Sequence, residues 1–343
     1  MQKTAKRTLI LALLLPLLIT FGALPVIAAE NSAAEFYKGK TVEYVIPYGV
    51  GGGTDQLSRL IIPYLEKRLG CSIVPANKAG AGGLIGLNYL WNAKKNGLTM
   101  GTVMYDAAVW GEFVQSSAVK FEIDKLNLVG GMEKQALILL AGKDSPYKTF
   151  EDLTKTTKPA LMGVPGKMST MHVLMALATE VWGFPIKFIS GYKGAAAFFK
   201  AAEGGEVDIV CGSEVSGGPR IKSGTVHPLV YLTQERESFF PDIPAVTETP
   251  PKNKAAFDQF ISAIWIYRFA RSVGMPPGVP ADRLAFVREA LKDTVKDPAL
   301  LAEAKKKGIT FLYTDPNEFK RQKAKLFGEM SAQDREHMKK LFK

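Results

Sequence analysis

The chain has 343 residues, of which 47% are hydrophobic and 22% are charged. This length and composition are sufficient for a sizeable core and suggest two domains. The formal net charge of +11 favours anionic partners, although a basic surface that only aids solubility is an equally good interpretation. Nucleic acid is not expected as a partner, because the basic residues are scattered and their densest runs resemble solvated helix faces.

The first 29 residues have the pattern of a secretory signal peptide. Three basic residues precede an apolar run at residues 9–19, and small residues then end the segment at Ala28 and Ala29. We expect cleavage after Ala28 or Ala29 and export of the mature protein. An uncleaved membrane anchor is the alternative, but two prolines and a glycine interrupt the apolar stretch and shorten any spanning helix.

The chain contains two cysteines, Cys71 and Cys211, each in or beside an apolar run. Export permits a disulfide between them. Their apolar surroundings and wide separation favour two buried free thiols instead. Two cysteines and three dispersed histidines do not have the spacing of a metal site, so no metal is expected.

Short apolar runs alternate with helical patterns along the chain, which is typical of an α/β fold with largely parallel sheets. Strands are expected at residues 41–47, 72–77, 98–105, 137–142, 160–166, 186–191, 207–213 and 227–233. A helix is expected to begin at Thr54 or Asp55 and to end at Gly70, and another to begin near Ser169. The tail from Pro280 onward is expected to be largely helical.

Two α/β lobes joined by crossovers are predicted from this pattern. Residues 30–135 together with 255–343 are expected to form the first domain, and residues 136–254 the second. A capping box at Thr149 and Asp152 is expected to open a helix soon after the first crossover. The segment 239–254 holds four prolines and few aliphatic residues, so we interpret it as a surface connection and as a candidate for the return crossover.

The sequence YVIPYGVGGGTDQLSRL, residues 44–60, reads as a strand, a glycine-rich turn and the start of a helix. Consecutive glycines at Gly51, Gly52 and Gly53 would expose main-chain N–H groups at the positive end of the helix. Such a turn is suited to hold a phosphate or a carboxylate. The alternative is a tight strand-to-helix connection without a ligand.

Known nucleotide and enzyme motifs are absent from the sequence. The dinucleotide fingerprint fails because Thr54 occupies the last glycine position and no acidic residue lies between Glu66 and Asp106. There is also no Gly-x-Ser-x-Gly nucleophile motif. His172 near Ser169 could form a catalytic pair, but such close neighbours on a helix are more often structural. No catalytic residue and no cofactor are therefore expected.

The second lobe contains further small polar turns at the expected ends of strands. They place Ser169 and Thr170 at one predicted helix start and Tyr192, Lys193 and Gly194 at another, and Ser213 at the end of a predicted strand. Ligands bind at the carboxyl ends of strands in open parallel sheets. Each serine or threonine has the alternative role of a helix N-cap, but together the turns predict a second wall that binds an anion without a dedicated arginine.

Five separated motifs, GGGTDQLSR, NKAGAGGLIG, NGLTMGT, SGYKGAAAFFKAAEGGEVD and FFPDIPAVTE, follow one another along nearly the whole mature chain. In their order and spacing the sequence resembles the substrate-binding proteins of tripartite tricarboxylate transporters, also called the Bug family. The resemblance implies a monomeric periplasmic receptor with a two-lobed Venus-flytrap fold of the type II kind. Such a receptor closes on a small organic carboxylate and passes it to membrane permease subunits without changing it.

The resemblance also implies a ligand site. A carboxylate would be held by the main chain of the first turn, with further contacts from Tyr48, Gly82 and the second-lobe turns. The expected ligand-binding residues are Tyr48, Gly51, Gly52, Gly53, Thr54, Asp55, Gly82, Ser169, Thr170, Tyr192, Lys193, Gly194 and Ser213. An ionised Asp55 would repel an anion, so we expect it to cap the helix or to bind a ligand hydroxyl or an ordered water.

Some positions depart from the family pattern. Lys78 and Ala79 stand where members usually have Arg-Pro, Ala195 stands where they have Pro, and Tyr48 replaces a common Phe. These changes leave the ligand open among aliphatic dicarboxylates, tricarboxylates, aromatic acids and small amides. Two alternatives to a transport receptor also remain, namely an exported α/β enzyme acting on an anionic substrate and a receptor that docks to a signalling protein.

Overall fold

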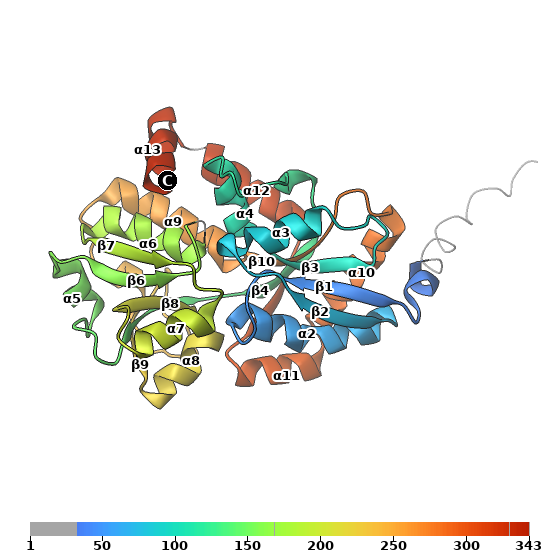
Figure 1. Cartoon of the computed structure of the whole chain (residues 1–343), viewed down its shortest axis with the longest axis horizontal. Coiled ribbons are helices and arrows are strands. Elements are labelled where there is room, and N and C mark those ends of the chain that lie inside the picture. Colours follow the sequence, from blue (N-terminus) through green and yellow to red (C-terminus); the bar gives the residue numbers. More distant parts are fainter. Residues whose placement is uncertain (1–32, 168, 329, 343) are drawn as a thin grey trace, which may run out of the picture.

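The computed structural model describes residues 33–342 except 168 and 329, and it shows two α/β lobes lying side by side (Figure 1). The predicted signal peptide at residues 1–29 lies outside the described residues. The predicted two-lobed α/β fold is confirmed. In the part of the chain that is described, no helix is both long and apolar enough to cross a membrane.

The first lobe is built on a six-stranded sheet. In spatial order its strands are β11 (Thr310–Thr314), β4 (Asn127–Lys134), β10 (Arg271–Met275), β3 (Thr99–Met104), β1 (Thr41–Ile46) and β2 (Ser72–Asn77). The second lobe has a five-stranded sheet. Its strands are, in order, β7 (Ile186–Ser190), β6 (Ala160–Val164), β8 (Ile209–Ser213), β5 (Leu137–Gly142) and β9 (Val226–Tyr231).

Both sheets are mixed, so the expectation of largely parallel sheets is wrong. The strands β1, β2 and β3 are parallel to one another, and so are β6, β7 and β8. The strand β10 is antiparallel to both β3 and β4, and β5 is antiparallel to both β8 and β9. These two antiparallel strands lie beside the crossovers, where the chain enters each sheet from the other lobe rather than from a helix of its own lobe.

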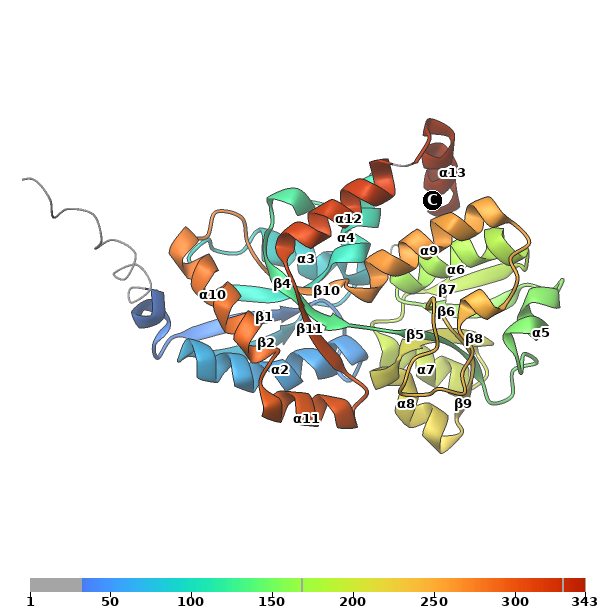
Figure 2. The same ribbon diagram turned by 180° about the vertical axis from the view of Figure 1, so that it is seen from behind.

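Helices cover the faces of both sheets (Figures 1 and 2). In chain order they are α2 (Gly53–Leu69), α3 (Leu84–Trp91), α4 (Tyr105–Phe113), α5 (Phe150–Lys155), α6 (Thr170–Trp182), α7 (Ala195–Glu203), α8 (Glu214–Ser223), α9 (Lys254–Arg268), α10 (Ala281–Thr294), α11 (Pro298–Lys306), α12 (Pro316–Gly328) and α13 (Ala332–Phe342). Short 3₁₀ turns lie at Ala81–Gly83, Ile123–Lys125 and Val246–Glu248.

Local sequence signals explain several helix ends. The helix α2 ends at Gly70, whose left-handed backbone (φ 67°) donates its N–H to the carbonyl of Glu66. The helix α5 begins with the expected capping box, in which Thr149 and Asp152 satisfy each other's main-chain N–H groups. The helix α2 begins one or two residues earlier than expected, with Gly52 as its N-cap.

The chain crosses between the lobes after β4 and again between α9 and β10. The helix α9, which follows the proline-rich segment, packs closely against α6 of the second lobe. The division into domains at residues 135 and 254 stays a prediction, and the packing of α9 favours a second boundary nearer to Arg268. The C-terminal helices lead from the first lobe to the second, with α12 contacting both β4 and α9, and α13 contacting α6 (Figure 2).

The buried side chains form three clusters. One lies between α2, α10 and the first sheet, and a smaller one lies between α7 and the second sheet. The largest joins the two lobes through α4, α6, α9 and the C-terminal helices. Cys71 and Cys211 are both buried and free, as expected.

Candidate functional site: a cleft at four helix starts

A cavity of about 40 Å³ lies between the two lobes. Eight of the thirteen expected ligand-binding residues line it, namely Tyr48, Gly52, Gly53, Thr54, Ser169, Thr170, Gly194 and Ser213. The remaining five, Gly51, Asp55, Gly82, Tyr192 and Lys193, are not among its lining residues. The structure therefore brings the predicted turns of both lobes together around one space, and the part of each residue in ligand binding stays a prediction.

Four of the expected ligand-binding residues at this cavity are helix N-caps, namely Gly52 for α2, Ser169 for α6, Gly194 for α7 and Ser213 for α8. Met104, the N-cap of α4, lines the cavity as well. The first N–H groups of a helix have no acceptor within the helix, and the helix dipole places partial positive charge at that end. Four such ends around one small space make a strong anion-binding environment.

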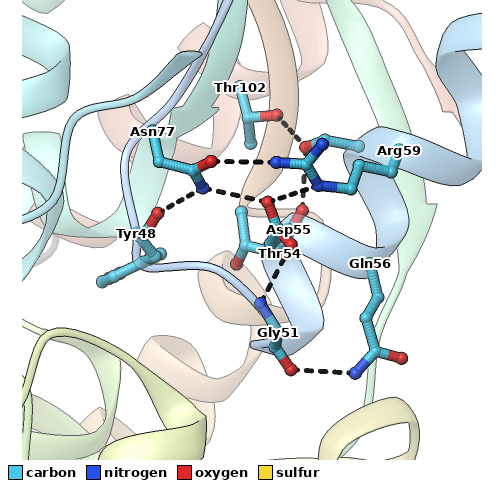
Figure 3. A network of polar contacts seen from close by, with 9 residues as sticks. Tyr48, Gly51, Thr54, Asp55, Gln56, Arg59, Asn77 and Thr102 are labelled. Carbon is cyan, nitrogen blue, oxygen red and sulfur yellow. Dashed lines mark hydrogen bonds and ion pairs between the residues drawn. The ribbon is translucent and has the colours of Figure 1, made fainter. Parts of the chain in front are cut away.

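The carboxylate of Asp55 supports the glycine turn of the first lobe, residues 51–53 (Figure 3). The Oδ2 atom of Asp55 accepts a hydrogen bond of 2.9 Å from the main-chain N–H of Gly51. Its Oδ1 atom accepts hydrogen bonds of 2.9 Å from Arg59 Nε and from Asn77 Nδ2. Asn77 also donates to the carbonyl of Tyr48, and so joins the end of β2 to the same turn. Asp55 thus supports the glycine turn, whereas the N-cap of α2 is Gly52 and not Asp55.

The electrostatics of Asp55 agree with this supporting role. Burial by itself would raise its pKa, but the hydrogen bonds from Gly51, Arg59 and Asn77 lower the pKa below its ordinary value. The carboxylate therefore remains ionised behind the turn. The N–H of Gly51 already donates to Asp55. A ligand in the cavity would therefore bind the later main-chain N–H groups at the cavity wall, those of Gly53 and Thr54.

Tyr48 ties a second loop to the same wall. Its hydroxyl donates a hydrogen bond of 2.8 Å to the carbonyl of Gly82, within the 3₁₀ turn before α3. Burial raises the pKa of Tyr48, so the hydroxyl keeps its proton and acts as a donor. Gly82 thus contributes by accepting from Tyr48, although it does not line the cavity.

The two lobes are in direct contact around the cavity. The N–H of Gly49 donates a hydrogen bond of 2.7 Å to the carbonyl of Lys193 in the second lobe. A Cβ atom added at Gly49 would lie 2.7 Å from that same oxygen, so only glycine permits this approach. Gly194 follows with a φ of 155°, a conformation that side chains disfavour. The structure is therefore that of a closed cleft.

A second contact between the lobes joins Thr170 to Asp106. The Thr170 hydroxyl, at the start of α6, donates to Oδ2 of Asp106 in the first turn of α4. Asp106 is only 1% exposed, and this burial raises its pKa to about 7. A group that titrates near neutral pH therefore lies at the point where the lobes meet.

Sequence reasoning missed several residues that the structure places at the cavity, above all Arg271. It lines the cavity at the start of β10, and its Nη1 donates to Glu133 at 2.7 Å, with both side chains buried. Gln135 and Tyr267, which hydrogen-bond to each other beside the crossovers, also line the cavity. The available signal was an arginine in the middle of an otherwise apolar segment, FARSVGM.

The pair formed by Ser169 and His172 has the geometry of a helix cap. The Ser169 hydroxyl accepts from the main-chain N–H of His172 and donates at 2.7 Å to the carbonyl of Gly166. The His172 ring packs on Phe188, and burial lowers the pKa of this histidine to about 4. Within the described residues, no group of three or more His, Cys, Asp or Glu side chains is arranged to hold a metal ion.

Proteins of similar sequence and of similar fold are known. A UPF0065 protein of Agrobacterium vitis is 26% identical over 288 residues, covering 83% of this chain and 79% of the relative. The structure of MatC from Rhodopseudomonas palustris with bound malate has a TM-score of 0.70 at 20% identity, covering 89% of this chain and 99% of the other. A second R. palustris protein, solved with adipate, has a TM-score of 0.73 at 21% identity, covering 88% and 97% of the two chains.

The family match extends over most of the chain. Residues 57–341 match the family described as "Tripartite tricarboxylate transporter family receptor", TctC. This range contains α2 from Leu57 onward, both crossovers and the second-lobe turns that line the cavity. The chain therefore belongs to the tripartite tricarboxylate transporter receptor family, as its sequence motifs predicted.

Proposed function

We propose that this protein is a periplasmic receptor that captures a small organic carboxylate and delivers it to the membrane subunits of a tripartite tricarboxylate transporter. In this function the protein holds its ligand between two lobes and makes or breaks no covalent bond. The proposed location requires that the predicted signal peptide directs export.

The convergence of four helix starts on one cavity carries this proposal. Helix N-termini bind carboxylates through main-chain N–H groups, and enclosure between the lobes strengthens this attraction because water is excluded. The malate and adipate bound by two neighbours of similar fold are both carboxylates, which supports the same ligand class here.

Closure of the cleft explains how the ligand would be recognised. The amides of Gly53 and Thr54 come from the first lobe, whereas Ser169 and Ser213 come from the second. A ligand that contacts both sets favours the closed state over the open one, since its contacts are complete only when the lobes meet. The same two-sided contact would let the transporter distinguish loaded from empty receptors.

The substitution Gly52→Val tests the proposal. A Cβ atom at position 52 would lie 3.5 Å from the main-chain nitrogen of Ala195, so Gly52→Ala is tolerated at ordinary contact distance. The two further methyl groups of valine would enter the gap between the lobes and prevent closure. Gly52→Val should therefore lose binding of malate, adipate, citrate and benzoate in calorimetry, while Gly52→Ala keeps it and both variants unfold with a normal transition.

Two further measurements separate a receptor from an enzyme. Native mass spectrometry of the purified protein should reveal a bound acid, and incubation with that acid should return it unchanged. If the wild-type protein binds no carboxylate of a broad panel, or if it consumes one, the proposed function is wrong. If Gly52→Val kept its affinity, binding would not depend on closure of the lobes at the glycine turn.

A further inference from the structure

Arg271 is a buried cation that lines the cavity. It is the first residue of β10, directly after the return crossover, and is 6% exposed. Its Nη1 donates to Oε2 of Glu133 on β4 at 2.7 Å. Glu133 balances the charge, which allows the guanidinium to remain ionised away from solvent.

One edge of this guanidinium is left without an acceptor. Arginine has five N–H donors, and the edge formed by Nε and Nη2 can bind both oxygens of one carboxylate. The Nε atom of Arg271 is buried and has no hydrogen-bond partner among the described residues. A buried donor without an acceptor is costly, so a group inside the cavity is expected to satisfy it.

The groups around this edge indicate what kind of ligand group would bind there. A Cβ atom added at Gly53 would lie 3.3 Å from Nη2 of Arg271 and 2.8 Å from the hydroxyl oxygen of Ser213. The free edge of Arg271 therefore lies close to the start of α2 and the start of α8. A carboxylate at this place would receive charged hydrogen bonds from Arg271 as well as main-chain N–H groups from the glycine turn.

We propose that Arg271 is the residue that determines specificity for a carboxylate, binding it side-on through Nε and Nη2. Glu133 is a positioning residue, which holds Nη1 and so turns the free edge toward the cavity. This inference rests on the proposed function and deepens it, because the receptor then recognises an ionised carboxylate by charge and geometry. An amide or an ester of the same shape lacks the second anionic oxygen and is rejected.

The rest of the cavity suits the non-carboxylate part of such a ligand. Met104, Leu137, Pro165 and Phe198 form its apolar lining. A short carbon chain or a small ring can therefore lie against these side chains while its acid group binds Arg271. Arg271 selects the acid group, and the space between the apolar side chains limits the size of the rest of the ligand.

The test compares acids with their amides on three variants. Malate and adipate serve as probes, with malamide and adipamide as uncharged analogues of similar shape. The variants are Arg271→Lys, Arg271→Gln and the double substitution Arg271→Gln with Glu133→Gln. The double variant removes both charges of the pair and avoids an unpaired buried Glu133, so it guards against a simple failure to fold.

Isothermal calorimetry on the full mature protein gives the affinities, and thermal unfolding shows that each variant is folded. Wild-type protein should bind at least one acid more tightly than its amide. In Arg271→Gln and in the double variant, affinity for that acid should fall at least about tenfold, because hydrogen bonds to charged groups are lost. The preference for acid over amide should disappear, and Arg271→Lys should be intermediate because lysine lacks the planar fork.

Three results would overturn the inference in distinguishable ways. Folded Arg271 variants that keep both affinity and preference would exclude a contact between Arg271 and the ligand, while the proposed function stands. An equal loss of acid and amide binding would assign Arg271 a structural role only. If the wild-type protein binds neither these two acids nor any other carboxylate of the broad panel, the proposed function itself is overturned.

Discussion

The two walls of the cleft are built differently, although both present helix starts to the same cavity. On the first lobe, α2 begins at Gly52 with no side-chain cap. On the second lobe, α6 and α8 begin with the hydroxyls of Ser169 and Ser213, which accept N–H groups of their own helices. The first wall therefore presents main-chain N–H groups that no side chain caps, whereas the serine hydroxyls already accept some of the N–H groups of the second wall.

From this difference we expect the first lobe to bind an anion more strongly than the second. Bare glycine amides can approach a ligand closely, but such a turn has no side chains of its own to hold its shape. The structure supplies that support from behind through Asp55, which joins Gly51, Arg59 and Asn77. On the second lobe, serine hydroxyls cap α6 and α8 locally, whereas α7 begins at Gly194 without a side-chain cap.

The largest expected effect comes from removing the support of the first wall. Asp55→Ala leaves three donors without their acceptor, so the free energy of unfolding should fall by about 2–3 kcal/mol. Carboxylate affinity should fall as well, because the glycine turn loses its fixed shape. Urea unfolding followed by circular dichroism gives the first quantity and calorimetry the second. Asp144→Ala, at an exposed loop carboxylate, is the matched control and should change neither.

The pH dependence of Asp55 gives a second check on the same wall. Its pKa is lowered on folding from the ordinary value of 3.8. Its contribution is therefore fully present above about pH 4 and is lost as the pH falls further through the lowered pKa. Asp55→Asn should reduce the loss of stability seen when wild-type protein is acidified from pH 5 to pH 2. Identical acid curves would contradict the role of Asp55 as an ionised support.

An intermediate effect is expected at the contact between the walls. Asp106 accepts from Thr170 of the opposite lobe, and burial raises its pKa from 3.8 to about 7. In the closed state Asp106 thus holds a proton that a solvated carboxylate would release, so closure weakens as the pH rises from about 4 to 7. Ligand affinity should fall by at most about tenfold per pH unit in this window.

Calorimetry across this pH range in wild-type protein and Asp106→Asn checks the prediction. Asparagine keeps the shape and the acceptor for Thr170 but does not titrate, so the variant should show little change between pH 5 and 7. A pH profile that is unaltered by Asp106→Asn would show that another group controls closure.

The smallest effect is expected on the second wall. Ser213→Ala removes the side-chain cap of α8 and should lower the free energy of unfolding by about 1 kcal/mol. It should weaken ligand binding less than Asp55→Ala does, since the amides of the first wall are untouched. Ser223→Ala, in the exposed last turn of the same helix, serves as the control for urea unfolding and calorimetry. A larger loss of binding in Ser213→Ala than in Asp55→Ala would reverse the proposed ranking of the two walls.

Local features of the site could be predicted because their signals lie within a few residues of one another. The three glycines before α2, the end of α2 at Gly70 and the capping box at Thr149 each depend on adjacent backbone geometry. The helix start at Ser169 was also predicted, since serine after a strand is a frequent N-cap. Ser213 was predicted only as the end of a strand, and the structure makes it the N-cap of α8.

Elements whose stability comes from distant partners were missed. The strands β4 and β10 have the sequences NLVGGMEK and RSVGM, which lack a long apolar run. They are strands because each is enclosed by neighbours from other parts of the chain. The helix α9 was likewise not assigned to the second lobe, because the prolines before it suggested a crossover that the chain makes only after it.

The sequence by itself determined the α/β class, the two-lobed organisation, the family and the glycine and serine turns, because these depend on local patterns and on motif order. Only the tertiary structure decided that four helix starts surround one cavity, that Asp55 supports the glycine turn and that Arg271, paired with Glu133, lines the cavity. The order of strands in the first sheet, where β4 lies beside β10, brings residues 133 and 271 together. Such proximity arises from packing over long sequence distances, and no short stretch of the chain encodes it.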